Sequence, residues 1–181
     1  MMKSITLHDK VFVPFISNEE IEKAIDKVAE EVKLKHSCDE QAPILLCVLN
    51  GAILFTAELM KRLDFPCELM SIKVSSYEGT ESQGVVRETL GLNSDIKGRN
   101  IIICEDIVDT GNTLAYLQKV LKEKGAAKVE VCTLLLKTEV YKQEFKLDYV
   151  AMEIPARFIV GFGLDYDQLG RNSKDIYVLK D

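Results

Sequence analysis

A chain of 181 residues, of which 47% are apolar and 29% charged, has the size and composition of one globular domain with a substantial core. Its 23 basic and 29 acidic side chains give a net charge of -6, which argues against broad nucleic-acid binding because that function needs a basic surface. No apolar run approaches the roughly 18–20 residues that span a bilayer, and residues 1–10 lack the apolar core of a signal peptide, so we expect a cytoplasmic protein without a membrane partner.

The first half of the chain alternates between helical and strand patterns. A capping box at residues 17–20 predicts the start of a helix, and apolar residues at helical spacing continue it to about Lys35. Residues 43–49 are a continuous apolar run of strand length. Residues 52–63 return to helical spacing, and residues 68–75 predict a second strand.

The middle of the chain opens with a polar, glycine-bearing segment. Residues 77–84 show no periodicity and predict a mobile loop, after which residues 85–92 predict an antiparallel strand. Residues 100–104 are a third buried strand. Apolar residues then recur at helical spacing from 114 to 121, and Gly125 predicts the end of that helix.

Two further strands are predicted, at residues 128–136 and 149–152, and the tail after Pro155 reads as a small irregular subdomain. Alternating strands and helices, with strands apolar on both faces, predict an α/β fold with a mostly parallel central sheet flanked by helices. No linker divides the chain, so we expect a single domain over residues 1–181. Ligands of such folds bind beyond the carboxyl ends of the strands, where residues 49–52 and 105–112 are predicted to form loops.

The cysteines indicate a reducing compartment. Their count is odd and none forms a C-x-x-C pair, so we expect buried, reduced thiols. With only two histidines in the chain, a structural zinc site is not expected. The five cysteines are Cys38, Cys47, Cys67, Cys104 and Cys132.

The stretch IIICEDIVDTGNTL, residues 101–114, joins a buried strand to a helix and combines two kinds of chemistry. Backbone N–H groups around a glycine at a helix N-terminus, with nearby hydroxyls, bind anions such as phosphate. The carboxylates just upstream cannot bind that phosphate, but they suit ribose hydroxyls, Mg²⁺ or a proton on a reacting base. The carboxylates are Glu105, Asp106 and Asp109, and the phosphate-binding positions are Thr110, Gly111, Asn112 and Thr113.

A sugar phosphate satisfies both halves of this stretch, although acidic residues and threonines at such a junction also occur simply as helix caps. The chain contains neither a G-x-x-x-x-G-K-[ST] loop nor a G-x-G-x-x-G motif, which argues against a Walker-type nucleotide site and a dinucleotide fold.

The segment ICEDIVDTGNTL resembles the 5-phosphoribosyl 1-pyrophosphate (PRPP) motif of the type I phosphoribosyltransferases. Its Glu-Asp-x-x-Asp-Thr-Gly form resembles the 6-oxopurine branch, the hypoxanthine-guanine phosphoribosyltransferases. Other segments match in the family's order over nearly the whole chain. Leu49-Asn50-Gly51 resembles the pyrophosphate loop, Ser76-Tyr77 the start of the lid, and Lys137 the purine-binding lysine. RFIVGFGLDY (157–166) and Arg171 resemble the C-terminal hood.

The resemblance implies transfer of phosphoribosyl from PRPP to N9 of hypoxanthine or guanine, which gives IMP or GMP and pyrophosphate. It implies Mg²⁺ as the cofactor, with Glu105, Asp106 and Asp165 as metal ligands, and a homodimer or homotetramer. The family fold implied is a core of about residues 17–154 with a hood formed by residues 155–181 and the N-terminal segment. Positioning and charge stabilisation would supply most of the catalysis.

The resemblance also implies a role for each matched side chain. Glu105 and Asp106 would accept from the ribose hydroxyls, and Asp109 would act as the general base at purine N7. Lys137 would donate to the 6-oxo group, which adenine lacks. Phe158 would stack on the purine, and Ile159 and Asp165 would contact its edge. Pyrophosphate would be bound by Leu49, Asn50, Gly51 and Arg171. The family's pattern also implies a cis peptide bond at Leu49–Asn50. The lid would begin at Ser76 and Tyr77.

Taken singly, several of these residues have simpler interpretations: a solvated strand-end lysine at 137, a core aromatic at 158 and a surface charge at 171. Asn112 and Asn50 stand where the family often has a cation, which removes positive charge near phosphates. Two alternative functions remain at this point. One is a regulator that keeps the fold but binds RNA or DNA, and the other is a transferase for xanthine, adenine or a pyrimidine.

Overall fold

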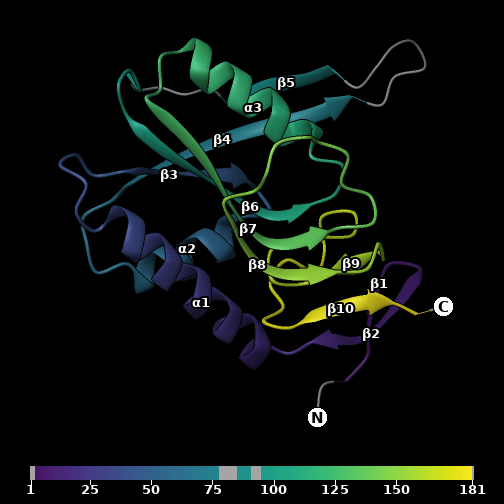
Figure 1. Ribbon diagram of the computed structural model, residues 1–181. Helices are drawn as coiled ribbons and strands as arrows, with labels where there is room; N and C mark the ends of the chain where they lie inside the picture. Colours follow the sequence, from purple (N-terminus) through teal and green to yellow (C-terminus); the bar gives the residue numbers. More distant parts are fainter. Residues whose placement is uncertain (1–2, 78–84, 91–94, 181) are drawn as a thin grey trace.

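The computed structural model describes residues 3–77, 85–90 and 95–180, which form two β-sheets and three helices (Figure 1). The central sheet has six strands in the order β5-β4-β3-β6-β7-β8. The strands of this sheet are β3 (Ile44–Leu49), β4 (Glu68–Tyr77), β5 (Val85–Leu90), β6 (Asn100–Val108), β7 (Lys128–Lys137) and β8 (Tyr149–Ile154).

Five of these strands run parallel, and β5 pairs antiparallel with β4, which confirms the predicted fold class. The first four residues of β3, 44–47, lie opposite 101–104 of β6, and both segments are buried. A strand that is covered on both faces must be apolar throughout, which explains the unbroken apolar run that predicted β3.

Three helices cover the two faces of the central sheet. The helices α1 (Asn18–His36) and α2 (Ile53–Arg62) lie on one face, and α3 (Asn112–Glu123) lies on the other (Figure 1). The predicted capping box is present, because Ser17 N donates to Glu20 Oε2 at 2.8 Å while Glu20 N donates to Ser17 Oγ at 3.4 Å. Gly125 follows α3 with a φ of 85°, a left-handed conformation that favours glycine.

The hood is an antiparallel sheet in the order β1-β2-β10-β9. The tail after Pro155, predicted to be irregular, contributes two short strands to it, and turns and isolated bridges connect them. The strands of the hood are β1 (Ile5–Leu7), β2 (Lys10–Ile16), β9 (Ile159–Val160) and β10 (Ile176–Leu179). Two of them are very short, and β10 pairs with a strand from the other end of the chain. A local periodicity therefore carries little signal for them. Both ends of the chain lie beside this sheet (Figure 1).

The strand β6 extends to Val108, four residues beyond the predicted end at Cys104. Glu105 and Asp106 are therefore strand residues, and the prediction that they begin a loop was wrong. The ladder with β7 continues to the pair Val108 and Leu136, so backbone pairing outweighs the low strand preference of the two acids. The predicted lid beyond Tyr77, residues 78–84, lies outside the described residues.

The cysteines are all unpaired, as expected. Cys47, Cys104 and Cys132 are buried, whereas Cys38 is exposed and Cys67 is partly so, which corrects the expectation that all five are buried. Over the described part of the chain, no helix combines the length and the apolar character that crossing a membrane requires.

A buried carboxylate is surrounded by basic side chains at the end of the central sheet opposite the carboxyl ends. Glu130 on β7 is 1% exposed and accepts from the hydroxyl of Tyr149 at 3.2 Å. Its Oε2 lies 3.3 Å from Nζ of Lys128 in an ion pair and 2.9 Å from Nε2 of His36, and neither contact has the geometry of a hydrogen bond. Its Oε1 also bonds Lys35. Burial alone would raise the pKa of Glu130. The surrounding cations lower the pKa by more than burial raises it, so the net shift is downward.

This arrangement predicts a pH-dependent contribution to stability. A carboxyl with a depressed pKa stabilises the fold fully above its ordinary pKa of 4.5, and that contribution is lost as pH falls below it. We expect Glu130→Gln to lower the free energy of unfolding at pH 7 because it removes the anion from these contacts. The loss should be limited to about 1–3 kcal/mol, because Lys35 and Lys128 are partly solvated. Urea denaturation should show the difference from the parent protein shrinking at pH 4; a difference that stays constant would contradict this assignment.

Candidate active site

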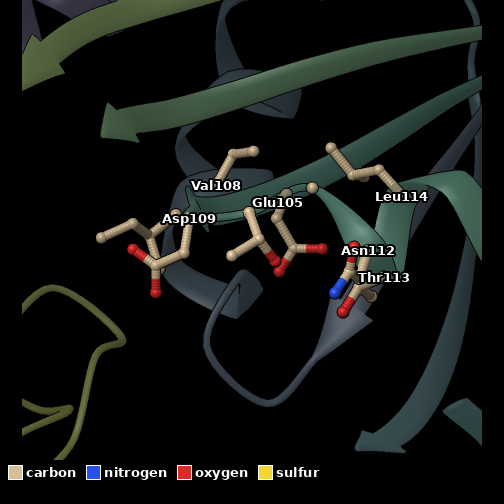
Figure 2. A pocket seen from close by; sticks show the side chains of 9 residues that line it. Glu105, Val108, Asp109, Asn112, Thr113 and Leu114 are labelled. Atoms are coloured by element: carbon tan, nitrogen blue, oxygen red, sulfur yellow. The ribbon is translucent and has the colours of Figure 1, made fainter. Parts of the chain in front are cut away.

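A pocket opens where β6 ends and α3 begins, at the carboxyl edge of the central sheet. Its volume is about 130 Å³, enough for a phosphate group with its immediate neighbours. Figure 2 shows Asp109 at one end, Asn112 and Thr113 at the other, and Glu105 between them. The lining residues are Glu105, Ile107, Val108, Asp109, Thr110, Gly111, Asn112, Thr113 and Leu114.

Gly111 is the N-cap of α3 and has a φ of 80°, so the tight turn into the helix uses the left-handed conformation that glycine adopts without strain. A glycine offers no side chain to cap the helix, and the N–H groups of the first turn therefore remain available to a ligand. Together with the hydroxyls of Thr110 and Thr113, these groups give the pocket the donors that an anion site needs, and phosphate binding here stays a prediction.

Glu105 and Asp106 differ in what they face. Only Glu105 lines the pocket, although its carboxyl also interacts with that of Asp106. Among the described residues, its enclosed Oε2 has no hydrogen-bond partner. Burial raises the pKa of Glu105, and the adjacent carboxyl of Asp106 raises it further.

Asp106 is 8% exposed and lies against the loop that follows β3. Burial raises its pKa as well, while a hydrogen bond of 3.0 Å from Ile107 N to its Oδ1 offsets part of the shift. A Cβ on Gly51 would lie 1.8 Å from Asp106 Oδ2, so the glycine is required for the two segments to meet. The predicted cis peptide bond is present between Leu49 and Asn50.

The hood closes the other side of this loop. A Cβ on Gly163, which has a φ of 99°, would lie 2.0 Å from the carbonyl oxygen of Gly51. Arg171 donates through Nη1 to the carbonyl of Gly163 at 2.8 Å and pairs through Nη2 with Asp165 Oδ1 at 2.6 Å. The predicted pyrophosphate loop, Asp106 and the hood arginine therefore form one contiguous cluster.

Asp109 and Lys137 form an ion pair beside the phosphate pocket. Nζ of Lys137, at the end of β7, lies 2.7 Å from Oδ1 of Asp109 just after β6. The Lys137 side chain is 14% exposed and that of Asp109 53%, so the pair has one sheltered cation and one accessible carboxylate. The lysine is not the fully solvated strand-end side chain of the simpler interpretation.

Phe158 and Ile159 belong to the hood, and neither lines the phosphate pocket. Phe158 is 45% exposed, with its ring centroid 6.0 Å from that of Phe12 and 5.8 Å from that of Tyr166. It is an open aromatic face, not the core residue of the simpler interpretation. Ile159 is buried in β9. Ser76 and Tyr77 end β4, and their side chains lie outside what the structure describes.

Comparison with known proteins identifies the family. The family model for the phosphoribosyl transferase domain matches residues 16–167. The chain belongs to the phosphoribosyltransferase family. This phosphoribosyltransferase spans most of the length of its curated relatives, as the next comparisons show.

The hypoxanthine-guanine phosphoribosyltransferase of Streptococcus thermophilus is 45% identical over 77% of this chain and 78% of its own. That of Streptococcus pneumoniae is 41% identical over 92% of each chain. A solved structure of hypoxanthine phosphoribosyltransferase from Trypanosoma cruzi, a ternary complex with substrates, superposes with a TM-score of 0.85 at 37% identity, covering 92% of this chain and 94% of that one.

The acidic residues of this phosphoribosyltransferase fit Mg²⁺. No cluster of three potential metal-binding side chains occurs within residues 3–77, 85–90 and 95–180. Mg²⁺ needs few, because it keeps several waters and takes substrate phosphates as ligands. The unpartnered Oε2 of Glu105 and the buried Asp106 supply carboxylate oxygens of the required kind. Both oxygens of Asp165 are engaged, by Arg171 and by Gln168 N at 2.8 Å.

Sequence analysis missed two residues that pack against the phosphate loop, Tyr141 and Gln143. They lie between β7 and β8 in a segment with no motif, and only the fold brings them to Gly111. The same is true of Gly163, whose close approach to Gly51 joins segments more than a hundred positions apart. No local pattern identifies such contacts.

Proposed function

We propose that this phosphoribosyltransferase transfers the 5-phosphoribosyl group of PRPP to N9 of a 6-oxopurine, hypoxanthine or guanine, and so salvages purines as IMP or GMP with release of pyrophosphate. The observation that carries the base assignment is the ion pair between Asp109 and Lys137 at 2.7 Å. It places an acceptor and a donor side by side next to the phosphate pocket. The relatives named above are supporting evidence.

The pair matches one edge of a 6-oxopurine. N7 and the 6-oxo group are neighbours on that edge, and the oxygen is an acceptor. The Lys137 ammonium donates to the 6-oxo oxygen, while the Asp109 carboxylate accepts the proton carried by N7. Adenine presents a donor amine in place of the oxygen, so a fixed ammonium disfavours it.

Phosphoribosyl transfer then rests on positioning. The Thr110–Thr113 turn binds the 5′-phosphate, Glu105 and Asp106 hold the ribose hydroxyls, and Leu49, Asn50, Gly51 and Arg171 contact the pyrophosphate. When bound, Mg²⁺ would neutralise charge on the phosphates, and Glu105 and Asp106 are the residues that would hold it. Asp165, the third ligand proposed, would first have to give up its contact with Arg171 or with Gln168 N. Phe158 stacks on the base, and Ile159 and Asp165 contact its edge. Ser76 and Tyr77 begin the lid that excludes water.

Lys137→Ala tests the base assignment. Loss of a charged hydrogen bond to the 6-oxo group should raise KM for hypoxanthine by about 10- to 100-fold and leave KM for PRPP nearly unchanged. The measurement is initial-rate kinetics with each substrate varied in turn, and Lys146→Ala, an exposed lysine of the β7–β8 connection, is the matched control. Unchanged kinetics with hypoxanthine would remove Lys137 from the base site.

A regulator that binds RNA or DNA is the competing function. The net charge of -6 and the retention of Asp109 and Lys137 in one ion pair favour catalysis over that role. A gel-shift assay with RNA and DNA, run beside a PRPP-dependent turnover assay, separates the two.

We also propose a homodimer or homotetramer in the cytoplasm, built from one domain with a core of about residues 17–154. Light scattering of the purified protein tests the assembly. The five unpaired cysteines support the reducing compartment.

A further inference from the structure

The phosphate loop is held from outside by a side chain that no motif includes. Gln143, in the connection between β7 and β8, donates through Nε2 to the carbonyl oxygen of Thr110 at 3.0 Å and to Oδ1 of Asn112 at 3.0 Å. A Cβ on Gly111 would lie 2.6 Å from Cγ of Gln143 and 2.7 Å from the ring of Tyr141. The segment 141–143 is therefore in direct contact with the turn that forms the pocket.

The bond to Thr110 fixes the direction of a peptide plane. Lys142 N also donates to the Thr110 carbonyl, at 3.4 Å, so two donors hold this oxygen on the side of the β7–β8 connection. In a trans peptide unit the C=O and the N–H point in opposite directions. The N–H of Gly111 is consequently directed away from Gln143. Gly111 lines the pocket and Gln143 does not, so the side away from Gln143 is the side of the pocket.

The bond to Asn112 fixes the orientation of an amide. The Thr110 carbonyl can only accept, so the Gln143 atom that meets it is the Nε2 donor. The Asn112 atom that meets the same Nε2 must then be its acceptor Oδ1. No described residue accepts from Asn112 Nδ2, so both of its N–H groups remain available at the end of the pocket that Asn112 shares with Thr113 (Figure 2).

We propose that Gln143 is a positioning residue of the phosphate site, which sets the Gly111 N–H and the Asn112 amide as donors to the phosphate monoester of the substrate. This proposal rests on the proposed function. It also explains how the loop can bind phosphate with an asparagine at position 112. The Asn112 side chain is held with its N–H donors free, so a neutral amide donates to the phosphate at a position where the family often has a cation.

Gln143→Met tests the proposal, because methionine keeps the Cγ packing on Gly111 and loses both hydrogen bonds. We expect KM for PRPP to rise about tenfold, the effect of losing one to two neutral hydrogen bonds, with kcat and KM for hypoxanthine within about threefold of the parent protein. The dissociation constant of IMP, measured by calorimetry, should rise by a similar factor. Gln118→Met, at the middle of α3, is the matched control and should leave all these constants unchanged.

A double-mutant cycle with Asn112→Ala tests the amide half of the proposal. If Gln143 acts through Asn112, the two substitutions together should raise KM for PRPP by less than the product of their separate effects. Independent effects would contradict that half. An unchanged KM for PRPP in Gln143→Met, or a loss confined to kcat, would overturn the whole proposal. A parent protein that forms no IMP would instead refute the proposed function.

Discussion

Asp109→Asn should lower kcat by about 100- to 10,000-fold, the range of general acid–base contributions, while KM for PRPP changes little. The amide has nearly the same shape as the carboxylate, but it cannot take the N7 proton. Asp109 Oδ1 also faces Lys137 Nζ at 2.7 Å, so the substitution removes the anion of the pair and leaves the lysine in place. The lost proton acceptor and the lost anion both affect binding and deprotonation of the purine. Neither changes the loop proposed to bind the phosphate of PRPP.

Steady-state rates at saturating PRPP measure this effect, and thermal denaturation checks that the variant is folded. Asp64→Asn, an exposed aspartate between α2 and β4, is the matched control and should leave kcat unchanged. A near-normal kcat for Asp109→Asn would exclude Asp109 as the base, even if the ion pair has a structural role.

Gly51→Ala should lower kcat/KM by about a hundredfold, since displacement of site groups by 1 Å has that effect. The new Cβ would meet Asp106 at 1.8 Å from Oδ2 and 2.6 Å from Cγ, so either the carboxylate or the loop must move. Overpacking of this kind should also reduce the free energy of unfolding by about 1–3 kcal/mol. Assays of kcat/KM and of urea denaturation measure the two losses.

The double variant Gly51→Ala with Asp106→Ala separates the two effects. The atoms nearest to the added methyl group all belong to the Asp106 carboxyl, and alanine at 106 removes them. Stability should therefore return toward that of Asp106→Ala alone, whereas activity should stay low because the carboxylate is gone. If stability does not recover, the contact with Asp106 is not the source of the strain.

Much of the fold was predictable because its signals are local. The capping box fixed the start of α1, a continuous apolar run marked β3, and a largely apolar segment marked β7. The hood was less predictable because β9 has two residues and β10 pairs with the N-terminal strand β2. Its regular antiparallel pairing depends on partners at the far end of the chain, and no local periodicity reports it.

The candidate site likewise has parts that the sequence predicts and parts that it does not. The run from Glu105 to Thr113 carries its polar groups in nearly consecutive residues, so a pocket lined by this run was predictable from sequence, and its binding of phosphate stays a prediction. The end of β6 was misplaced because the two acids look like loop residues until the ladder with β7 is seen. The contact of Gly51 with Asp106 and the support from Gln143 arise only when separate segments meet, and no spacing in the sequence encodes them.

The most direct test of the account is an initial-rate assay with PRPP and Mg²⁺ and with hypoxanthine, guanine, xanthine and adenine in turn. We predict saturable, Mg²⁺-dependent formation of IMP or GMP and pyrophosphate from hypoxanthine or guanine, with adenine a poor substrate because it lacks the 6-oxo acceptor for Lys137. Turnover of adenine alone, or no PRPP-dependent turnover of any 6-oxopurine, would contradict the account.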